Sequence, residues 1–326
     1  MIRIAVLDDW QGIARESADW SGLAQRGEIV FFDQPLRGPE AAAQALAEFD
    51  VIVAMRERTA FPATLIARLP RLRMIALTGS RTWTMDIEAC TARRIVVCNT
   101  GGEKASAATA ELALGLLLAA ARFLPAADAS LRAGRFQDGV PAGSVLEGRT
   151  LGVIGLGKIG ARMARSGQAL GMQVLAWSQN LTPDKAQAAG ARRVDKATLL
   201  AQSDAVTLHL VLSERTRGIL GAEDLARMKP GAILINTSRG PLVDEAALLE
   251  RLRAGSLIAG LDVYGQEPLP PDHPLRRLPN TVLTPHLGYC TRDVYAQFYR
   301  ESIENVLAFL DGKPTRVLNP EALRSA

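Results

Sequence analysis

The chain has 326 residues, of which 48% are hydrophobic and 22% charged, which suits about two domains with separate cores. Its net charge of +4 comes from 38 basic and 34 acidic residues without a run of five like charges, which argues against a nucleic-acid partner. With only three histidines, no histidine-rich metal site is expected. Cys90, Cys98 and Cys290 form no CxxC motif and are typical of reduced thiols in a cytoplasmic protein.

Short apolar runs alternate with helix-like segments through the first hundred residues, and a second such series begins near residue 150. The ten N-terminal residues lack the apolar core of a signal peptide and are expected to form a strand. Strands that are each followed by a helix predict parallel sheets covered on both faces. The predicted strands are 2–7, 28–32, 51–55, 72–77, 95–99, 150–157, 172–178, 205–211, 231–238, 257–264 and 281–286.

Two long helical patterns are expected to connect two doubly wound α/β domains. The segment Ala105–Leu124 is nearly long enough to span a membrane, but it contains Glu111 and Arg122, so a buried helix and no membrane partner are expected. The helix over 293–312 is expected to return to the first domain. The cleft between the domains is the expected ligand site.

The sequence "VIGLGKIG" places Gly155, Gly157 and Gly160 after a predicted strand and before a predicted helix. The first glycine permits a tight turn, the second lets the backbone approach a pyrophosphate, and the third allows the helix to pack closely on the strand. The helix N-terminus then offers N–H groups to the phosphates. Residues 101–290 are therefore expected to form a dinucleotide-binding domain, and 1–100 with 291–326 a substrate domain.

The residue that usually separates NAD from NADP is missing. An acidic residue commonly ends the second strand and holds the adenosine ribose, but here Ser178 and Gln179 stand at that place. A hydroxyl does not repel a 2′-phosphate, although no arginine adjoins Ser178; Arg192 and Arg193 are the nearest and are expected in a solvated loop or at helix ends. We expect use of both cofactors with a slight preference for NADPH. The alternative is a merely polar strand end, with specificity set elsewhere.

Three charged residues follow predicted strands of the second series: Arg239, Glu267 and His286. Because the carboxyl ends of parallel strands meet at one edge of the sheet, these side chains can converge there. Arginine grips a carboxylate and polarises the adjacent carbonyl, histidine protonates a developing alkoxide, and a carboxylate stabilises the imidazolium. These groups suit hydride transfer to a 2-oxo acid.

The chain resembles the D-isomer-specific 2-hydroxyacid dehydrogenase family over nearly its whole length. The motifs "GLGKIG", "INTSRGPLVDEAAL", "GLDVYGQEP" and "LTPHLGY" match that family in order and spacing. The resemblance implies a flavodoxin-like substrate domain and a Rossmann domain that forms a homodimer. It also implies that Arg239 binds the carboxylate and carbonyl of the substrate and that Glu267 and His286 form the acid–base pair.

The resemblance further implies the residues that contact cofactor and substrate. Thr237 and Lys158-Ile159 are expected to touch the cofactor, and Asp262 and His286 to lie near the nicotinamide. The substrate loop is expected at Leu77–Trp83, with backbone N–H groups that hold the carboxylate. Its predicted binding residues are Gly79, Ser80 and Arg81.

Several residues depart from the family pattern. Ser80, Arg81 and Trp83 replace a small Gly and Val loop, and Arg81 is either solvent-facing or a grip on a second anionic group. Arg56 and Arg58 offer the same two interpretations, and Tyr289 could narrow the pocket. We expect His209 in a strand near the cofactor and His273 in a loop.

The preferred hypothesis is an NAD(P)-dependent D-2-hydroxyacid dehydrogenase that acts on glyoxylate or hydroxypyruvate. One alternative is phosphoglycerate dehydrogenase activity, motivated by Arg56, Arg58 and Arg81. Another is a non-catalytic, dinucleotide-sensing binding protein, which would bind the cofactor without turnover. Formate dehydrogenase activity fits poorly, because the predicted site is suited to protonating a carbonyl.

Overall fold

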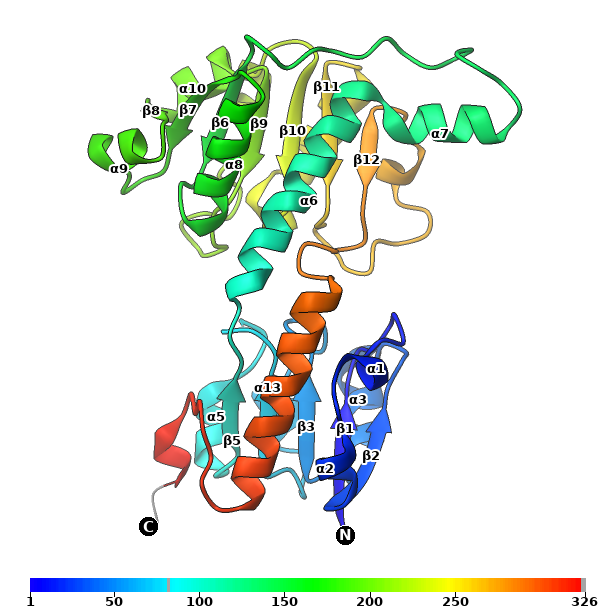
Figure 1. Ribbon diagram of the computed structural model, residues 1–326, viewed down its shortest axis with the longest axis vertical. Coiled ribbons are helices and arrows are strands. Elements are labelled where there is room, and N and C mark those ends of the chain that lie inside the picture. The colour runs from blue at the N-terminus through cyan, green and yellow to red at the C-terminus, as the bar shows by residue number, and fades with distance from the viewer. Residues whose placement is uncertain (81–82, 324–326) are drawn as a thin grey trace. The chain divides into compact units, whose positions relative to one another are not determined.

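Figure 1 shows the computed structural model of the chain, which describes residues 1–80 and 83–323. The chain forms two compact units. The first consists of Met1–Lys104 with Thr291–Ala326, and the second of Ala105–Cys290. Each unit is built around its own parallel sheet.

The sheet of the first unit has five parallel strands in the order β2-β1-β3-β4-β5. This is the 2-1-3-4-5 order of flavodoxin-like folds, which confirms the predicted fold class for this part of the chain. Each of the five apolar runs forms a strand, because residues buried on both faces of a sheet read as continuous apolar sequence. The strands are β1 Ile2–Val6, β2 Gly27–Phe31, β3 Val51–Ala54, β4 Met74–Leu77 and β5 Val96–Asn99.

Helices cover both faces of this sheet. The long helix α13 packs against β4 and against α1 and α2 (Figure 1). Apolar residues of α3, α4 and α5 join the sheet in the buried core on the other face. The helices are α1 Ala14–Ser17, α2 Ser21–Ala24, α3 Gly38–Leu46, α4 Ala63–Ile66, α5 Ile87–Ala92, α13 Arg292–Leu310 and the 3-10 helix η3 Pro320–Leu323.

The sheet of the second unit has seven parallel strands in the order β12-β11-β10-β9-β6-β7-β8. If β6 is counted as the first strand of this unit and the sheet is read from β8 to β12, the strand order is 3-2-1-4-5-6-7. This is the Rossmann order 3-2-1-4-5-6 with one further strand. The reversal of direction falls between β6 and β9. The strands are β6 Thr150–Ile154, β7 Gln173–Trp177, β8 Arg192–Arg193, β9 Ala205–Leu208, β10 Ala232–Asn236, β11 Leu257–Leu261 and β12 Thr281–Leu283.

Alternate side chains of the central strands enter separate cores on the two faces of this sheet. In β10, Ile233 and Ile235 join one core, whereas Leu234 joins the other. The helices are α6 Glu103–Arg122, α7 Leu124–Arg132, α8 Lys158–Ala169, α9 Pro183–Ala188, α10 Lys196–Gln202, α11 Ala222–Arg227, α12 Glu245–Arg253 and the 3-10 helices η1 Gly240–Leu242 and η2 Pro274–Arg277.

Helix α6 is the one helix among the described residues that is long and apolar enough to cross a membrane. Its residues Ala113, Leu116, Leu117 and Ala120 are buried in the core of the second unit. A close approach to the sheet is possible because Gly260 in β11 has no side chain: a Cβ there would lie 3.1 Å from the Leu116 Cβ. The helix therefore packs as a core helix, as its internal charges indicated.

One expectation about local structure was wrong. Arg192 and Arg193 form the edge strand β8, paired in parallel with Leu175 and Ala176 of β7, rather than a loop or helix end. Both arginines are exposed, and a two-residue strand with charged side chains lacks the apolar run by which the other strands are recognised. Charge is typical of edge strands because it discourages pairing with another chain.

Candidate active site

The glycine loop follows β6 directly, and each of its glycines has a distinct steric reason. Gly155 adopts φ +96°, and a Cβ there would lie 2.5 Å from the carbonyl oxygen of His209. A Cβ on Gly160 would collide with the carbonyl oxygen of Gly155. Gly157 has nothing within 4 Å of its virtual Cβ, so its open side leaves room for a ligand to reach the backbone.

Helix α8 begins at this open glycine. In the described residues, no side chain caps the helix at its N-cap Gly157. The helices after Asp195, Asp244 and Thr291 are each capped by the side chain of that residue. An uncapped helix N-terminus beside open space suits a pyrophosphate, because N–H groups and the positive end of the helix dipole point outward. Lys158 is exposed and Ile159 half-buried in this first turn.

The end of β7 lies next to the glycine loop. The N–H of Gly155 donates to the carbonyl oxygen of Trp177 at 2.9 Å. Ser178, the next residue after Trp177, therefore lies close to the glycine loop. Ser178 is half-buried and Gln179 is exposed, and the carbonyl of Ser178 accepts the N–H of Leu181 in a turn. Both predicted ribose-binding residues are therefore positioned at the strand end, whereas Arg192 of β8 donates to the side chain of Gln202 at 3.2 Å.

Two buried polar atoms near these strand ends have no hydrogen-bond partner within the described residues. One is Thr237 Oγ1, which follows β10, and the other is His209 Nδ1, which follows β9. Burial lowers the pKa of His209 to about 3, so its ring is neutral, and its Nε2 lies 2.8 Å from Thr207 Oγ1. His209 lies just past the strand rather than within it. An orphaned buried donor or acceptor such as Thr237 Oγ1 is what a ligand-binding wall would provide.

The turn after β10 holds Arg239 in place through its backbone. Asn236 is buried, and its side chain donates to the carbonyl oxygen of Arg239 at 2.9 Å and accepts the N–H of Ser238 at 3.0 Å. Ser238 Oγ in turn donates to the carbonyl oxygen of Leu208 at 2.7 Å. The predicted anion-binding arginine therefore stands on a turn tied to two neighbouring strands.

Glu267 and His286 form the expected pair. His286 Nδ1 lies 2.5 Å from Glu267 Oε2, and the other carboxylate oxygen accepts the N–H of Tyr264 at 3.1 Å. His286 adopts φ +56°, an uncommon conformation for a residue with a side chain. Both side chains remain partly exposed. Tyr289 lies beside them, with its ring centroid 6.0 Å from that of His286.

Asp262 is fully buried and binds the loop that carries His286. Its Oδ1 accepts Thr284 Oγ1 and the N–H of Leu287, each at 2.6 Å, and its Oδ2 accepts the N–H of Gly288 at 2.9 Å. Burial raises the pKa of Asp262, while these hydrogen bonds and the nearby imidazole oppose the shift. The carboxylate thus supports the histidine loop, which the sequence did not indicate; its contact with the nicotinamide stays a prediction.

The predicted substrate loop belongs to the first unit. Gly79 adopts φ +82°, and its N–H donates to Thr100 Oγ1 at 2.7 Å, so this amide is already used inside the protein. The Arg56 guanidinium occupies the place that a Gly79 side chain would take. Ser80 is exposed, and its carbonyl accepts the Asn99 side chain at 3.1 Å. Arg81 lies outside the described residues.

Two further predicted residues have structural partners. The Arg58 guanidinium lies 4.7 Å from the centroid of the Trp10 ring, and its charge opposes the rise that burial causes in the pKa of Asp8. His273 caps η2: its Nδ1 accepts the N–H of Leu275 at 3.3 Å and its Nε2 lies 3.1 Å from Glu245 Oε1. In the described part of the chain, no group of three His, Cys, Asp or Glu side chains could hold a metal ion.

Comparisons with family models, with curated proteins and with solved structures all indicate the same family. Residues 114–288 match the family model described as "D-isomer specific 2-hydroxyacid dehydrogenase, NAD binding domain". A D-3-phosphoglycerate dehydrogenase of Archaeoglobus fulgidus is 39% identical over 82% of this chain and 51% of the relative. A glyoxylate reductase of Korarchaeum cryptofilum is 39% identical over 78% of each chain. The crystal structure of a phosphoglycerate oxidoreductase from Vibrio cholerae has a TM-score of 0.91 and 37% identity, covering 96% of this chain and 100% of that one.

The chain spans about half the length of the phosphoglycerate dehydrogenases that it matches, but about four-fifths of the glyoxylate reductases. Similar sequence identity to both groups means that identity alone does not assign a substrate.

Proposed function

Because the chain belongs to the D-isomer specific 2-hydroxyacid dehydrogenase family, we propose that it transfers a hydride between NAD(P)H and a small 2-oxo acid to give a D-2-hydroxy acid. The observation that carries this proposal is the 2.5 Å contact between His286 Nδ1 and Glu267 Oε2, in the same unit as the glycine loop. A histidine held by a carboxylate is the acid–base group that reduction of a carbonyl requires.

The nicotinamide supplies the hydride when bound. His286 donates from Nδ1 to Glu267, so Nε2 is the nitrogen that gives a proton to the substrate oxygen during reduction and removes one during oxidation. Arg239 binds the substrate carboxylate and polarises the adjacent carbonyl. Reduction would use the protonated ring as proton donor, and oxidation would use the neutral ring as proton acceptor.

The residues present fit a dinucleotide. The backbone at Gly155, Gly157 and Gly160 with the first turn of α8 would hold the pyrophosphate. Ser178 and Gln179 would meet the adenosine ribose, and the orphaned Thr237 Oγ1, with Asp262 nearby, would face the nicotinamide end. We propose use of both NADH and NADPH with a slight preference for NADPH, because no carboxylate stands at the end of β7 to repel a 2′-phosphate.

Glyoxylate and hydroxypyruvate are the proposed substrates, supported by the relatives named glyoxylate reductase. Phosphoglycerate dehydrogenase activity is the second candidate. It is favoured by Arg56, whose guanidinium lies against Gly79 of the predicted substrate loop and could meet a second anionic group. Arg58 supports it less, because its guanidinium lies over the Trp10 ring.

We also propose a homodimer formed through the dinucleotide-binding unit. Its support is a set of exposed large apolar side chains on α6, α7 and the segment 133–148, which extends beyond α7 and returns toward β6 (Figure 1). Exposed apolar surface often marks an interface. These side chains are Leu118, Leu124, Leu131, Phe136 and Val145.

A cytoplasmic location without nucleic-acid or membrane partners completes the proposal. Cys90 and Cys98 are buried, and burial raises the pKa of each thiol to about 12, as suits structural thiols that stay reduced.

The test is turnover by the purified protein with glyoxylate and hydroxypyruvate, using NADH and NADPH at neutral pH, and with 3-phosphoglycerate in the oxidative direction. Arg239→Ala should lower kcat/KM on the order of 100-fold with unchanged NADPH affinity, because it removes the grip on the carboxylate. Loss of NADPH binding in this variant would refute the proposed role of Arg239. Cofactor binding by the native protein without turnover of any 2-oxo acid would favour the sensor alternative.

A further inference from the structure

Tyr264 lies between the two turns that carry the acid–base pair. Its side chain is buried, and its hydroxyl lies 2.9 Å from the carbonyl oxygen of Thr284 and 3.2 Å from that of Leu261. The phenol has one proton to donate, and the shorter contact makes Thr284 its main acceptor. The hydroxyl therefore joins the end of β11 to the end of β12 across 20 residues of sequence.

The same residue contacts both members of the catalytic pair, one directly and one through Thr284. The N–H of Tyr264 donates to Glu267 Oε1 at 3.1 Å. The carbonyl oxygen of Thr284 accepts both the Tyr264 hydroxyl and, at 3.0 Å, the N–H of His286. One tyrosine thus fixes the carboxylate by its backbone and the histidine turn by its side chain.

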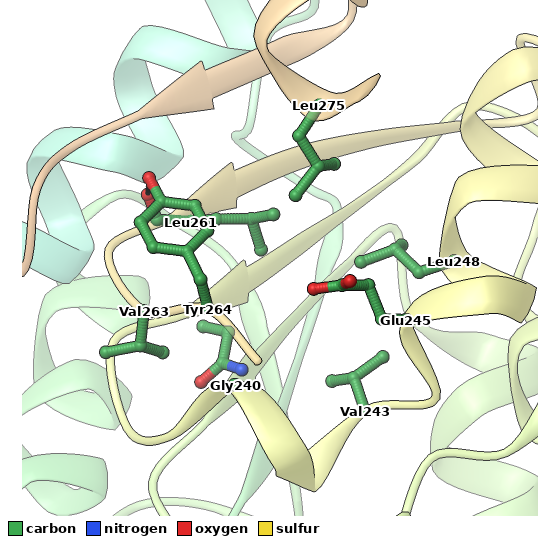
Figure 2. Close-up of a pocket in the computed structure, with 9 residues that line it drawn as sticks. Gly240, Val243, Glu245, Leu248, Leu261, Val263, Tyr264 and Leu275 are labelled. Carbon is green, nitrogen blue, oxygen red and sulfur yellow. Dashed lines mark hydrogen bonds between the residues drawn. The ribbon is translucent and has the colours of Figure 1, made fainter. Parts of the chain in front are cut away.

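The arginine turn packs against Tyr264 from the other side. A Cβ on Gly240, the residue after Arg239, would collide with the main-chain carbonyl of Tyr264. Behind the Tyr264 side chain, Figure 2 shows a pocket with Glu245 and Leu248 on the far wall. Its volume of about 290 Å³ includes open solvent, and its walls are mainly apolar.

We propose that Tyr264 is a positioning residue for the reaction, and that its hydroxyl holds the His286 turn at the distance from Glu267 that proton transfer needs. This inference rests on the proposed function. Misplacement of catalytic groups by a fraction of an ångström affects the chemical step more than substrate binding. Loss of the hydroxyl should therefore lower kcat and leave KM nearly unchanged.

The test compares Tyr264→Phe with Tyr295→Phe. Each change removes one buried hydroxyl that makes a hydrogen bond, and the Tyr295 hydroxyl lies 2.6 Å from Gln11 Oε1, in the other unit. Tyr264→Phe should lower kcat about five- to tenfold, on the order expected for one hydrogen bond, with KM for the 2-oxo acid and for NADPH within twofold of the native values. Tyr295→Phe should keep the native kcat.

A second readout is independent of turnover. Amide hydrogen exchange across residues 284–288 should become faster in Tyr264→Phe and stay native in Tyr295→Phe, because the freed turn opens more readily. Native kcat in Tyr264→Phe, or native exchange in this segment, would overturn the inference. If the native protein turned over no 2-oxo acid, the proposed function would fail by that assay, whereas faster exchange in Tyr264→Phe would still show that the hydroxyl fixes the turn.

Discussion

At the scale of one residue, Ser178 stands where the proposed cofactor site would place its adenosine end. It is half-buried at the end of β7, beside the glycine loop. A carboxylate at this place would accept hydrogen bonds from ribose hydroxyls and repel a 2′-phosphate, whereas the serine hydroxyl does neither strongly. The choice of cofactor should therefore respond to a single substitution.

Ser178→Asp should lower kcat/KM with NADPH on the order of 10- to 100-fold and leave the value with NADH within a few-fold. Steady-state kinetics with each cofactor measure this ratio. The control is Asn180→Asp, which adds the same charge two residues further on, at an exposed position. An equal loss in both variants would mean that net charge, not the place of Ser178, controls the preference.

Asp8 shows a different residue-scale effect, on stability. Burial raises its pKa from 3.8 to about 6, and Thr59 Oγ1 donates to it at 2.9 Å. A carboxyl whose pKa is raised in the folded state adds stability below its unfolded pKa, and this contribution is lost as the pH rises through about 6. At neutral pH the buried carboxylate is therefore a cost.

Asp8→Asn should raise the free energy of unfolding at pH 7 by about 1–3 kcal/mol and remove the loss of stability between about pH 4 and 6. Asparagine also tolerates the φ of +59° at this position. Chemical denaturation at several pH values measures both effects, with the exposed Asp272→Asn as control. A less stable variant at pH 7 would show that the charge on Asp8 is favourable in the fold.

At the scale of elements, a substitution at the N-terminus of α8 can separate an effect on cofactor binding from an effect on stability. Gly157 and Gly221 are both N-cap residues with extended backbone, φ −85° and −86°, and neither has an atom closer than 4.0 Å to its virtual Cβ. Gly157→Ala should keep the native Tm but weaken NADPH binding about tenfold or more, because the methyl group occupies the side that the pyrophosphate approaches. Gly221→Ala should change neither. Native NADPH affinity in Gly157→Ala would refute this role.

The elements also show which features the sequence predicts and which it does not. Long apolar runs predicted both parallel sheets, because a central strand such as β10 is buried on both faces. The edge strand β8 was missed, since two exposed arginines have no apolar period. Tyr264 was missed because its hydroxyl joins residues 261 and 284, a contact that no local spacing encodes. The Gly79 N–H was expected to face a ligand, and only the fold shows that Thr100 accepts it.

At the scale of the whole molecule, the proposed homodimer follows from exposed apolar side chains on α7 and the segment after it. Leu131→Glu should convert the dimer to a monomer, because a buried unpaired charge opposes association. Light scattering after size-exclusion chromatography measures the mass. The control is Val211→Glu, since Val211 is equally exposed, at 63%, on another part of the same unit. A native mass for Leu131→Glu would place the interface elsewhere.

The proposed division of labour between the two units has an evolutionary consequence. Arg239, Glu267 and His286 come from the same unit as the glycine loop, whereas Arg56, Gly79 and Ser80 come from the other. Under the proposed function, selection for a new substrate would act on the first unit, while the unit with the proposed proton-transfer residues stays constant. A library of variants confined to residues 56–58 and 79–83 should accordingly contain variants with an altered substrate range and few inactive variants. The reason is that these substitutions leave the proposed proton-transfer residues unchanged.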